Sequence, residues 1–194
     1  NMQNDQEKPQ IFFLILFLLF IINKNVHSVD DSDILIDRVF ITAVKKSNYQ
    51  KVEEMLDKDV AVNYKDSNDL VALAYALEND DKKMFDMLIA GGADSKVSIL
   101  KKSSLLIFYV AMNKYLLIDE LVKTGVNVQF QDRLGMTALM HSIEKANVNA
   151  VNILLNKEVN TELTDFSGKT IFDYADSSRN LLIKKLVESL KTSN

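Results

Sequence analysis

Side chains that commonly perform chemistry are scarce in this sequence of 194 residues. It has no cysteine, and its two histidines are His27 and His141. Disulfide frameworks, thiolate zinc sites and cysteine nucleophiles are therefore excluded, and two imidazoles give too little for a histidine metal cage. The sequence also lacks a glycine-rich phosphate loop, a G-x-S-x-G turn and an H-E-x-x-H motif. We predict a protein that is not an enzyme and that holds no cofactor or metal.

One acidic run, Asp30-Asp31-Ser32-Asp33, could be read as a set of calcium ligands. An EF-hand loop also needs a central glycine and a distal glutamate, which this run lacks. We interpret it as a solvated N-terminal linker. The whole chain has 23 basic and 27 acidic side chains and a net charge of −4. That charge is mild and of the wrong sign for gripping a phosphate backbone, so we expect no nucleic-acid partner.

Residues 11–22 (IFFLILFLLFII) form an apolar run without a polar side chain. A membrane-spanning helix needs about 20 such residues, whereas the core of a secretory signal is shorter. We predict that residues 1–28 are a signal peptide cleaved after Ser28, with an uncleaved membrane anchor and a buried core helix as alternatives. Asp5 and Glu7 weaken the positive charge that usually precedes a signal core. The rest of the chain is expected outside the cytoplasm, periplasmic or secreted, with membrane contact only through an uncleaved segment.

The elements that position the remaining side chains come from an internal repeat. Segments beginning at Asp66, Asp132 and Asp165 align without gaps, and their spacings are multiples of 33 residues. An apolar position recurs with the same period as Met55, Leu88, Leu121, Leu154 and Val187. The period predicts a domain over residues 29–194 with five units, at about 33–65, 66–98, 99–131, 132–164 and 165–194.

Each unit reads as a turn followed by two short helices. The Asp-x-x-Gly segments at 132–135 and 165–168 favour tight turns, and Thr137 and Thr170 are good N-caps for the helices that follow. Two apolar stretches at helical spacing come next and break near Ala146-Asn147. Helices this short bury their apolar faces only by stacking on neighbouring units.

These units resemble the ankyrin-repeat family. The family pattern Asp-x-x-Gly-x-Thr-Pro-Leu-His-x-Ala is matched by residues 132–142 (DRLGMTALMHS), and its Gly-Ala-Asp ending by residues 92–94. The resemblance implies an all-α solenoid of five helix-turn-helix units with short β-hairpin turns, whose protein partners dock on the hairpin tips and the concave face. The family proline is absent from every unit, and the third unit has Ile99 and Lys102 where Asp and Gly are expected.

At the repeat offset, His141 aligns with Tyr75, Phe108 and Tyr174. We therefore interpret it as one member of an aromatic column inside the stack of first helices rather than as a functional imidazole.

Apolar side chains at the turn tips are the best candidates for a binding site, because tips facing solvent are normally polar. We predict a hydrophobic strip edged by basic residues, a composition typical of binding hot spots. An alternative is that these side chains fold onto neighbouring tips and stiffen the array. The predicted partner-binding residues are Leu70, Leu100, Lys101, Arg133, Leu134, Met136, Phe166 and Lys169.

The sequence thus predicts a monomeric, non-enzymatic module for protein–protein interaction, exported or membrane-tethered, that binds one protein partner. A chaperone-like protector of an exported enzyme is the alternative function.

Overall fold

The computed structural model describes residues 31–192, in which ten α-helices are followed by one short 3-10 helix. The chain divides into two compact units between residues 36 and 37, inside helix α2 (Asp31–Lys45). The repeated helices lie in the second unit. The first helix of each later unit, here the inner helix, has seven residues and recurs every 33 residues. These are α4 (Ala72–Glu78), α6 (Leu105–Ala111), α8 (Ala138–Glu144) and α10 (Ile171–Ser177). The predicted period is therefore confirmed.

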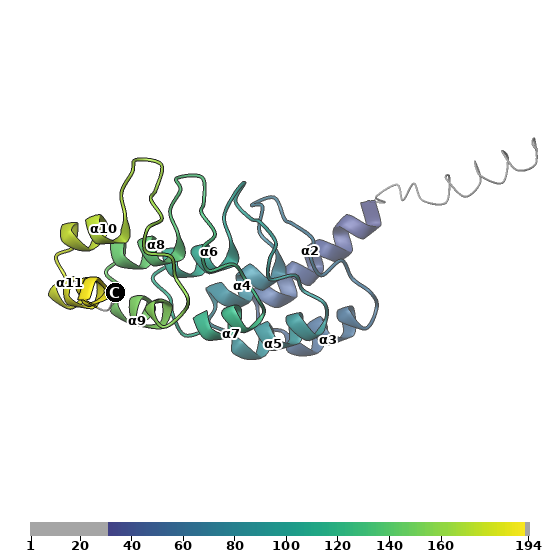
Figure 1. Ribbon diagram of the computed structural model, residues 1–194. Coiled ribbons are helices and arrows are strands. Elements are labelled where there is room, and N and C mark those ends of the chain that lie inside the picture. The colour runs from purple at the N-terminus through teal and green to yellow at the C-terminus, as the bar shows by residue number, and fades with distance from the viewer. Residues whose placement is uncertain (1–30, 193–194) are drawn as a thin grey trace, which may run out of the picture. The chain divides into compact units, whose positions relative to one another are not determined.

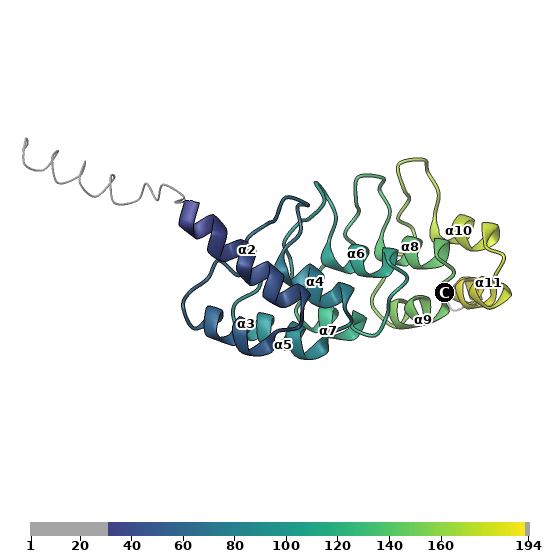
Figure 2. The same cartoon turned by 180° about the vertical axis from the view of Figure 1, so that it is seen from behind.

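The second helix of each unit lies in a separate outer row. Figures 1 and 2 show α4, α6, α8 and α10 side by side, with the outer helices beneath them and long loops projecting beyond the inner row. The outer helices are α3 (Tyr49–Leu56), α5 (Lys82–Ala90), α7 (Ile118–Lys123), α9 (Val148–Leu155) and α11 (Leu181–Glu188), and η1 (Ser189–Thr192) follows. No strand occurs in residues 31–192, so the predicted all-α solenoid is confirmed.

The core lies between the two helix rows and between neighbouring units. The recurring apolar position predicted from the period is buried in all five outer helices, as Met55, Leu88, Leu121, Leu154 and Val187. The residues that follow the first four of these are only partly buried. This alternation fits helices that turn one apolar face inward and stack on their neighbours.

Four outer helices begin at a side-chain cap in the same register. Asn48, Asp81, Asn147 and Asn180 each accept a hydrogen bond from a backbone N–H of the first helical turn. The third unit has Lys114 at this position, and lysine has no acceptor. Helix α7 accordingly starts three residues late, and the Tyr109 hydroxyl accepts the Leu117 N–H at 3.0 Å. One substitution in the repeat thus shortens one helix.

The start of the array departs from the expected linker and turn. Residues 31–38 are helical, so residues 31–33 do not form the predicted linker and the first unit has no turn before its inner helix. The predicted targeting helix at residues 1–28 lies outside the described residues. Among the helices of residues 31–192, none combines the length and apolar character needed to cross a bilayer.

Candidate functional site

Four loops precede the inner helices and form the candidate site. We name them loop two (residues 66–70), loop three (99–103), loop four (132–136) and loop five (165–169). In loops two, four and five the first residue's N–H donates to the fifth residue's carbonyl, at 2.9–3.1 Å. Loop three closes with two such bonds, between Ile99 and Ser103, at 2.9 and 2.7 Å. These hairpin-like turns are held by single pairs, so within the described residues the predicted β-hairpins do not extend into strands.

A buried aspartate fastens loop four. One Asp132 oxygen, Oδ1, accepts the N–H groups of Leu134 and Met136 at 2.8 and 3.0 Å. The other, Oδ2, lies 2.8 Å from His141 Nε2 on α8. Burial disfavours the charged carboxylate, but the hydrogen bonds from His141 and the two backbone N–H groups outweigh burial and lower the pKa of Asp132. His141 thus ties the loop to its helix. Its place in an aromatic column stays a prediction.

Loops two and five repeat this arrangement with tyrosine in place of histidine. Asp66 accepts two backbone N–H groups of its loop and the Tyr75 hydroxyl, and Asp165 accepts two N–H groups and the Tyr174 hydroxyl. Burial opposes ionisation of Asp165, yet these bonds and that of Ser167 lower its pKa to about 2. The nine-residue spacing from aspartate to aromatic is visible in the sequence, although we did not predict the hydrogen bond.

Loop three has neither partner of this pair. Ile99 occupies the aspartate position and is fully buried, and Phe108 occupies the aromatic position. Its backbone also differs, because Leu100 and Lys101 both have positive φ, of 49° and 67°. Loop two supports it from the side, since Asp69 Oδ2 accepts the Lys101 N–H at 2.7 Å. The unit that departs from the family pattern therefore has a different turn.

Six of the eight predicted binding residues lie exposed on the loops. Leu134 is 57% exposed to solvent and Phe166 is 69% exposed. The others are Leu100, Lys101, Arg133 and Lys169. We predicted that Leu70 and Met136 are also exposed, and this was wrong, because they are only 9% and 4% exposed to solvent. Each is the fifth residue of its loop, and its N–H and carbonyl bond back to the first residue, so the side chain joins the core ahead of the inner helix.

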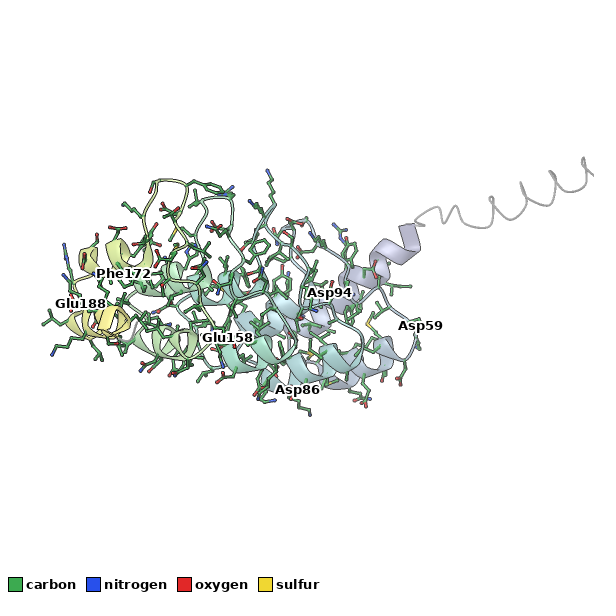
Figure 3. The ribbon with its side chains drawn as sticks, in the orientation of Figure 1. Asp59, Asp86, Asp94, Glu158, Phe172 and Glu188 are labelled. Carbon is green, nitrogen blue, oxygen red and sulfur yellow. The ribbon has the colours of Figure 1, made fainter. Side chains whose placement is uncertain are left out.

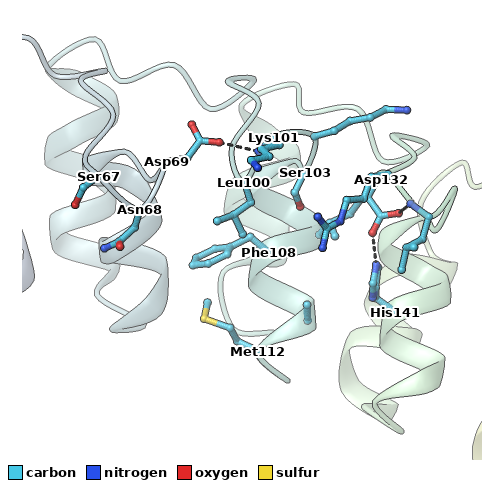
Figure 4. Close-up of a pocket in the computed structure, with 15 residues that line it drawn as sticks. Ser67, Asn68, Asp69, Leu100, Lys101, Ser103, Phe108, Met112, Asp132 and His141 are labelled. Carbon is cyan, nitrogen blue, oxygen red and sulfur yellow. Dashed lines mark hydrogen bonds and ion pairs between the residues drawn. The ribbon is translucent and has the colours of Figure 1, made fainter.

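Beneath loops two, three and four lies a groove of about 670 Å³. Figure 4 shows Leu100, Phe108 and Met112 in a column on the loop-three side, with Ser67 and Asn68 across from them and His141 on the far side. Phe108 and Met112 are floor residues that we did not predict as part of the site. The signal was present, because the third unit has Ala111-Met112 where the second and fourth have Glu78-Asn79 and Glu144-Lys145.

Neighbouring loops are joined unevenly along the array. Loop five bonds to loop four through the Phe166 N–H and the Leu134 carbonyl, at 3.0 Å. Loop three bonds to loop two through Asp69. Across the described chain, no hydrogen bond joins loop three to loop four. The groove therefore lies at a boundary between two joined pairs of loops.

Comparison with known proteins identifies the repeats. Residues 107–193 match the family model described as ankyrin repeats (3 copies). A putative ankyrin repeat protein of fowlpox virus is 29% identical over 63% of this chain and 29% of its own length. The phosphocholine transferase AnkX of Legionella pneumophila is 26% identical over 62% of this chain and 15% of its own length. The chain thus spans less than a third of either relative.

Proposed function

Because this chain is an ankyrin-repeat protein, we propose that it is a non-enzymatic module that binds one protein partner through loops three to five and the groove beneath them. Ankyrin repeats in general are modules for protein–protein interaction. The observation that carries the proposal for these loops is the exposure of Leu134 and Phe166.

Both side chains are exposed, although the Phe166 ring also lies against Gly135 of loop four. Their loops are held by Asp132 and Asp165 through backbone bonds, so the turns do not depend on a leucine or a phenylalanine at these positions. Clustered apolar side chains on a rigid surface, with basic residues beside them, are typical of the centres of protein interfaces. The rigid backbone also lowers the entropy lost on binding.

Nothing in the arrangement of the described residues favours catalysis. Residues 31–192 contain no group of three or more His, Asp or Glu side chains placed to hold a metal ion. The buried Asp132–His141 pair is occupied in fastening loop four. The name of the Legionella relative states a transferase activity, but only 15% of that protein matches this chain.

Partner capture with paired variants tests the proposal. The double change Leu134→Ser and Phe166→Ser removes the exposed apolar pair and leaves the buried Met136 in place. Its matched control is Leu181→Ser with Leu182→Ser, a pair on α11 with exposures of 72% and 51%. We expect the loop variant to lose partners that the parent protein and the control capture from the source cell, as read by mass spectrometry. Equal capture by all three proteins, at equal helical content by circular dichroism, would contradict the proposal.

We also propose that the apolar run at residues 11–22 directs the chain to a membrane or across it. The support is its composition, twelve consecutive apolar residues. Mass spectrometry of the N-terminus of the protein recovered from separated cell fractions tests this. An N-terminus at Val29 in the extracytoplasmic fraction is expected for a cleaved signal, whereas recovery only in the cytoplasm would overturn export.

A further inference from the structure

The rim of the groove carries a charge opposite to that of the whole chain. Lys101 and Lys102 of loop three and Arg133 of loop four line it, and all three side chains are exposed. The protein as a whole has a net charge of −4. A local cluster of three cations attracts anionic groups even on an acidic protein, because nearby charges dominate the electric field that an approaching ligand meets.

These cations form no ion pair in the part of the chain that the structure describes. In residues 31–192, no carboxylate oxygen lies within 4.0 Å of the charged nitrogens of Lys101, Lys102 or Arg133. Other lysines near the inner helices are paired, such as Lys65 with Asp69 at 3.1 Å and Lys114 with Asp80 at 2.6 Å. The side chain of Lys102 has an aromatic neighbour, with Nζ 5.5 Å from the centre of the Phe166 ring. The three rim cations thus have no ion-pair partner within 4.0 Å among the described residues, although Asp69 interacts electrostatically with Lys101.

The two carboxylates that line the groove already bond to other groups of the protein. Both oxygens of Asp132 accept hydrogen bonds from its own loop and from His141. Asp69 bonds to Lys65 and to the Lys101 backbone. Other exposed acids are Glu78 and Glu144, at the ends of the neighbouring inner helices α4 and α8. Figure 3 shows two more, Asp86 and Glu188, on the outer helices and away from the loop tips. The loop edge of the groove thus carries the cations Lys101, Lys102 and Arg133, while the two lining carboxylates are bonded to other groups.

The floor between the cations is apolar. Leu100, Phe108 and Met112 contribute it, and the latter two are only partly buried. Methionine adapts its shape to different apolar partners, and a groove of about 670 Å³ has room for a few side chains. A ligand that carried charge alone, such as a nucleic-acid backbone, would leave this apolar floor without a partner.

We propose that the groove binds an acidic peptide segment of the partner, with an apolar side chain seated on Phe108 and Met112 and flanking carboxylates paired with Lys101, Lys102 and Arg133. This inference rests on the proposed function and specifies the chemistry of the partner. Opposite charges at the rim speed association and select against basic segments, while the apolar contact supplies affinity.

A displayed library of random peptides of about eight residues, about 26 Å long when extended, tests the proposal against the immobilised protein. We expect the selected peptides to combine Asp or Glu with Leu, Met or Phe. Their affinity should fall at least about tenfold in the variant Lys101→Glu, Lys102→Glu, Arg133→Glu, since this reverses every favourable rim charge. A separate variant, Met112→Ser, should weaken the same peptides through the floor.

The matched control reverses three exposed lysines that do not line the groove, Lys58→Glu, Lys96→Glu and Lys185→Glu, which changes the net charge equally. Unchanged peptide affinity in this control is the expected result. Selection of basic or uncharged peptides, selection of none, or equal weakening by both triple variants would overturn the acidic segment. Tighter binding of a single-stranded DNA oligonucleotide than of any selected peptide would also overturn it.

The two proposals fail separately. If the Leu134→Ser, Phe166→Ser variant loses its captured partner while the rim variant keeps it, the interaction module stands and the acidic segment is wrong. If neither variant affects capture, the proposed site itself is wrong.

Discussion

Loops three and four are neighbours along the array, and each is held in its turn by different residues. Loop four is fastened by Asp132, which binds two backbone N–H groups and His141. Loop three replaces the polar pair with Ile99 and Phe108, and it relies on its own backbone bridge and on Asp69 of loop two. The difference indicates that the first residue of the loop and the residue nine positions later act as a pair. A polar aspartate comes with a polar partner nine residues later, and an apolar residue comes with an apolar one.

The largest effect is expected from breaking this pairing in loop three. Ile99→Asp puts a carboxylate at a fully buried position beside Phe108, which offers no hydrogen bond. We expect a loss of about 4 kcal/mol in the free energy of unfolding, the usual cost of an unpaired buried charge. Urea denaturation followed by circular dichroism measures it.

Adding Phe108→Tyr to that variant recreates the pair of Asp66 and Tyr75 in loop two. We expect the double variant to recover about 1.5–3 kcal/mol, the contribution of a hydrogen bond to a charged group. If the double variant is no more stable than Ile99→Asp alone, the positive φ angles of Leu100 and Lys101, and not the residue pair, determine what loop three accepts.

A glycine substitution is expected to separate loop four from loop five. Gly135 and Gly168 both have positive φ, of 77° and 85°. A Cβ on Gly135 would lie 2.7 Å from the Phe166 backbone nitrogen, whereas one on Gly168 would have no heavy atom within 4 Å. We expect Gly168→Ala to cost about 1 kcal/mol for its backbone angle and Gly135→Ala about 3 kcal/mol, because the second also breaks the contact between loops. Equal costs in thermal unfolding would show that the two loops do not support each other.

Removing the aspartate of loop four tests how much the fastening contributes. Asp132→Ala leaves the N–H groups of Leu134 and Met136 without their acceptor, and we expect a loss of about 2 kcal/mol. Hydrogen exchange should speed up at these two N–H groups and leave those of loop two unchanged. Unaltered exchange at both groups would mean that the carboxylate does not hold the loop.

The smallest expected effect is a loss of folding stability at low pH. Loop three does not contribute to it, because it has no such aspartate. Bonds to Asp66, Asp132 and Asp165 lower their pKa values in the folded state, to about 2 for Asp165. Below about pH 5 the unfolded chain binds more protons than the folded one, so the stability from these aspartates is full above that pH and falls as the pH drops toward 2. Urea midpoints measured against pH should fall less steeply in Asp165→Asn than in the parent. Parallel curves would contradict this source of acid sensitivity.

Much of the fold was predictable because the repeat has an exact period. The inner helices begin where the aligned segments place them, and the buried column at Leu88 follows from the same spacing. The site was less predictable. Leu70 and Met136 look like exposed turn residues, but the hydrogen bonds to Asp66 and Asp132 that turn them inward depend on three-dimensional geometry. Phe108 looks like a core residue, whereas the polar residues aligned with Met112, Asn79 and Lys145, indicate a surface position.

The middle unit of the array contains two irregularities. Lys114 leaves its outer helix without the usual cap, and Ile99 leaves its loop without the usual aspartate. In such an array each unit contacts only its neighbours, and stability is approximately the sum of the units and their interfaces. Both irregularities therefore act on the same two interfaces, those of the third unit with the second and with the fourth.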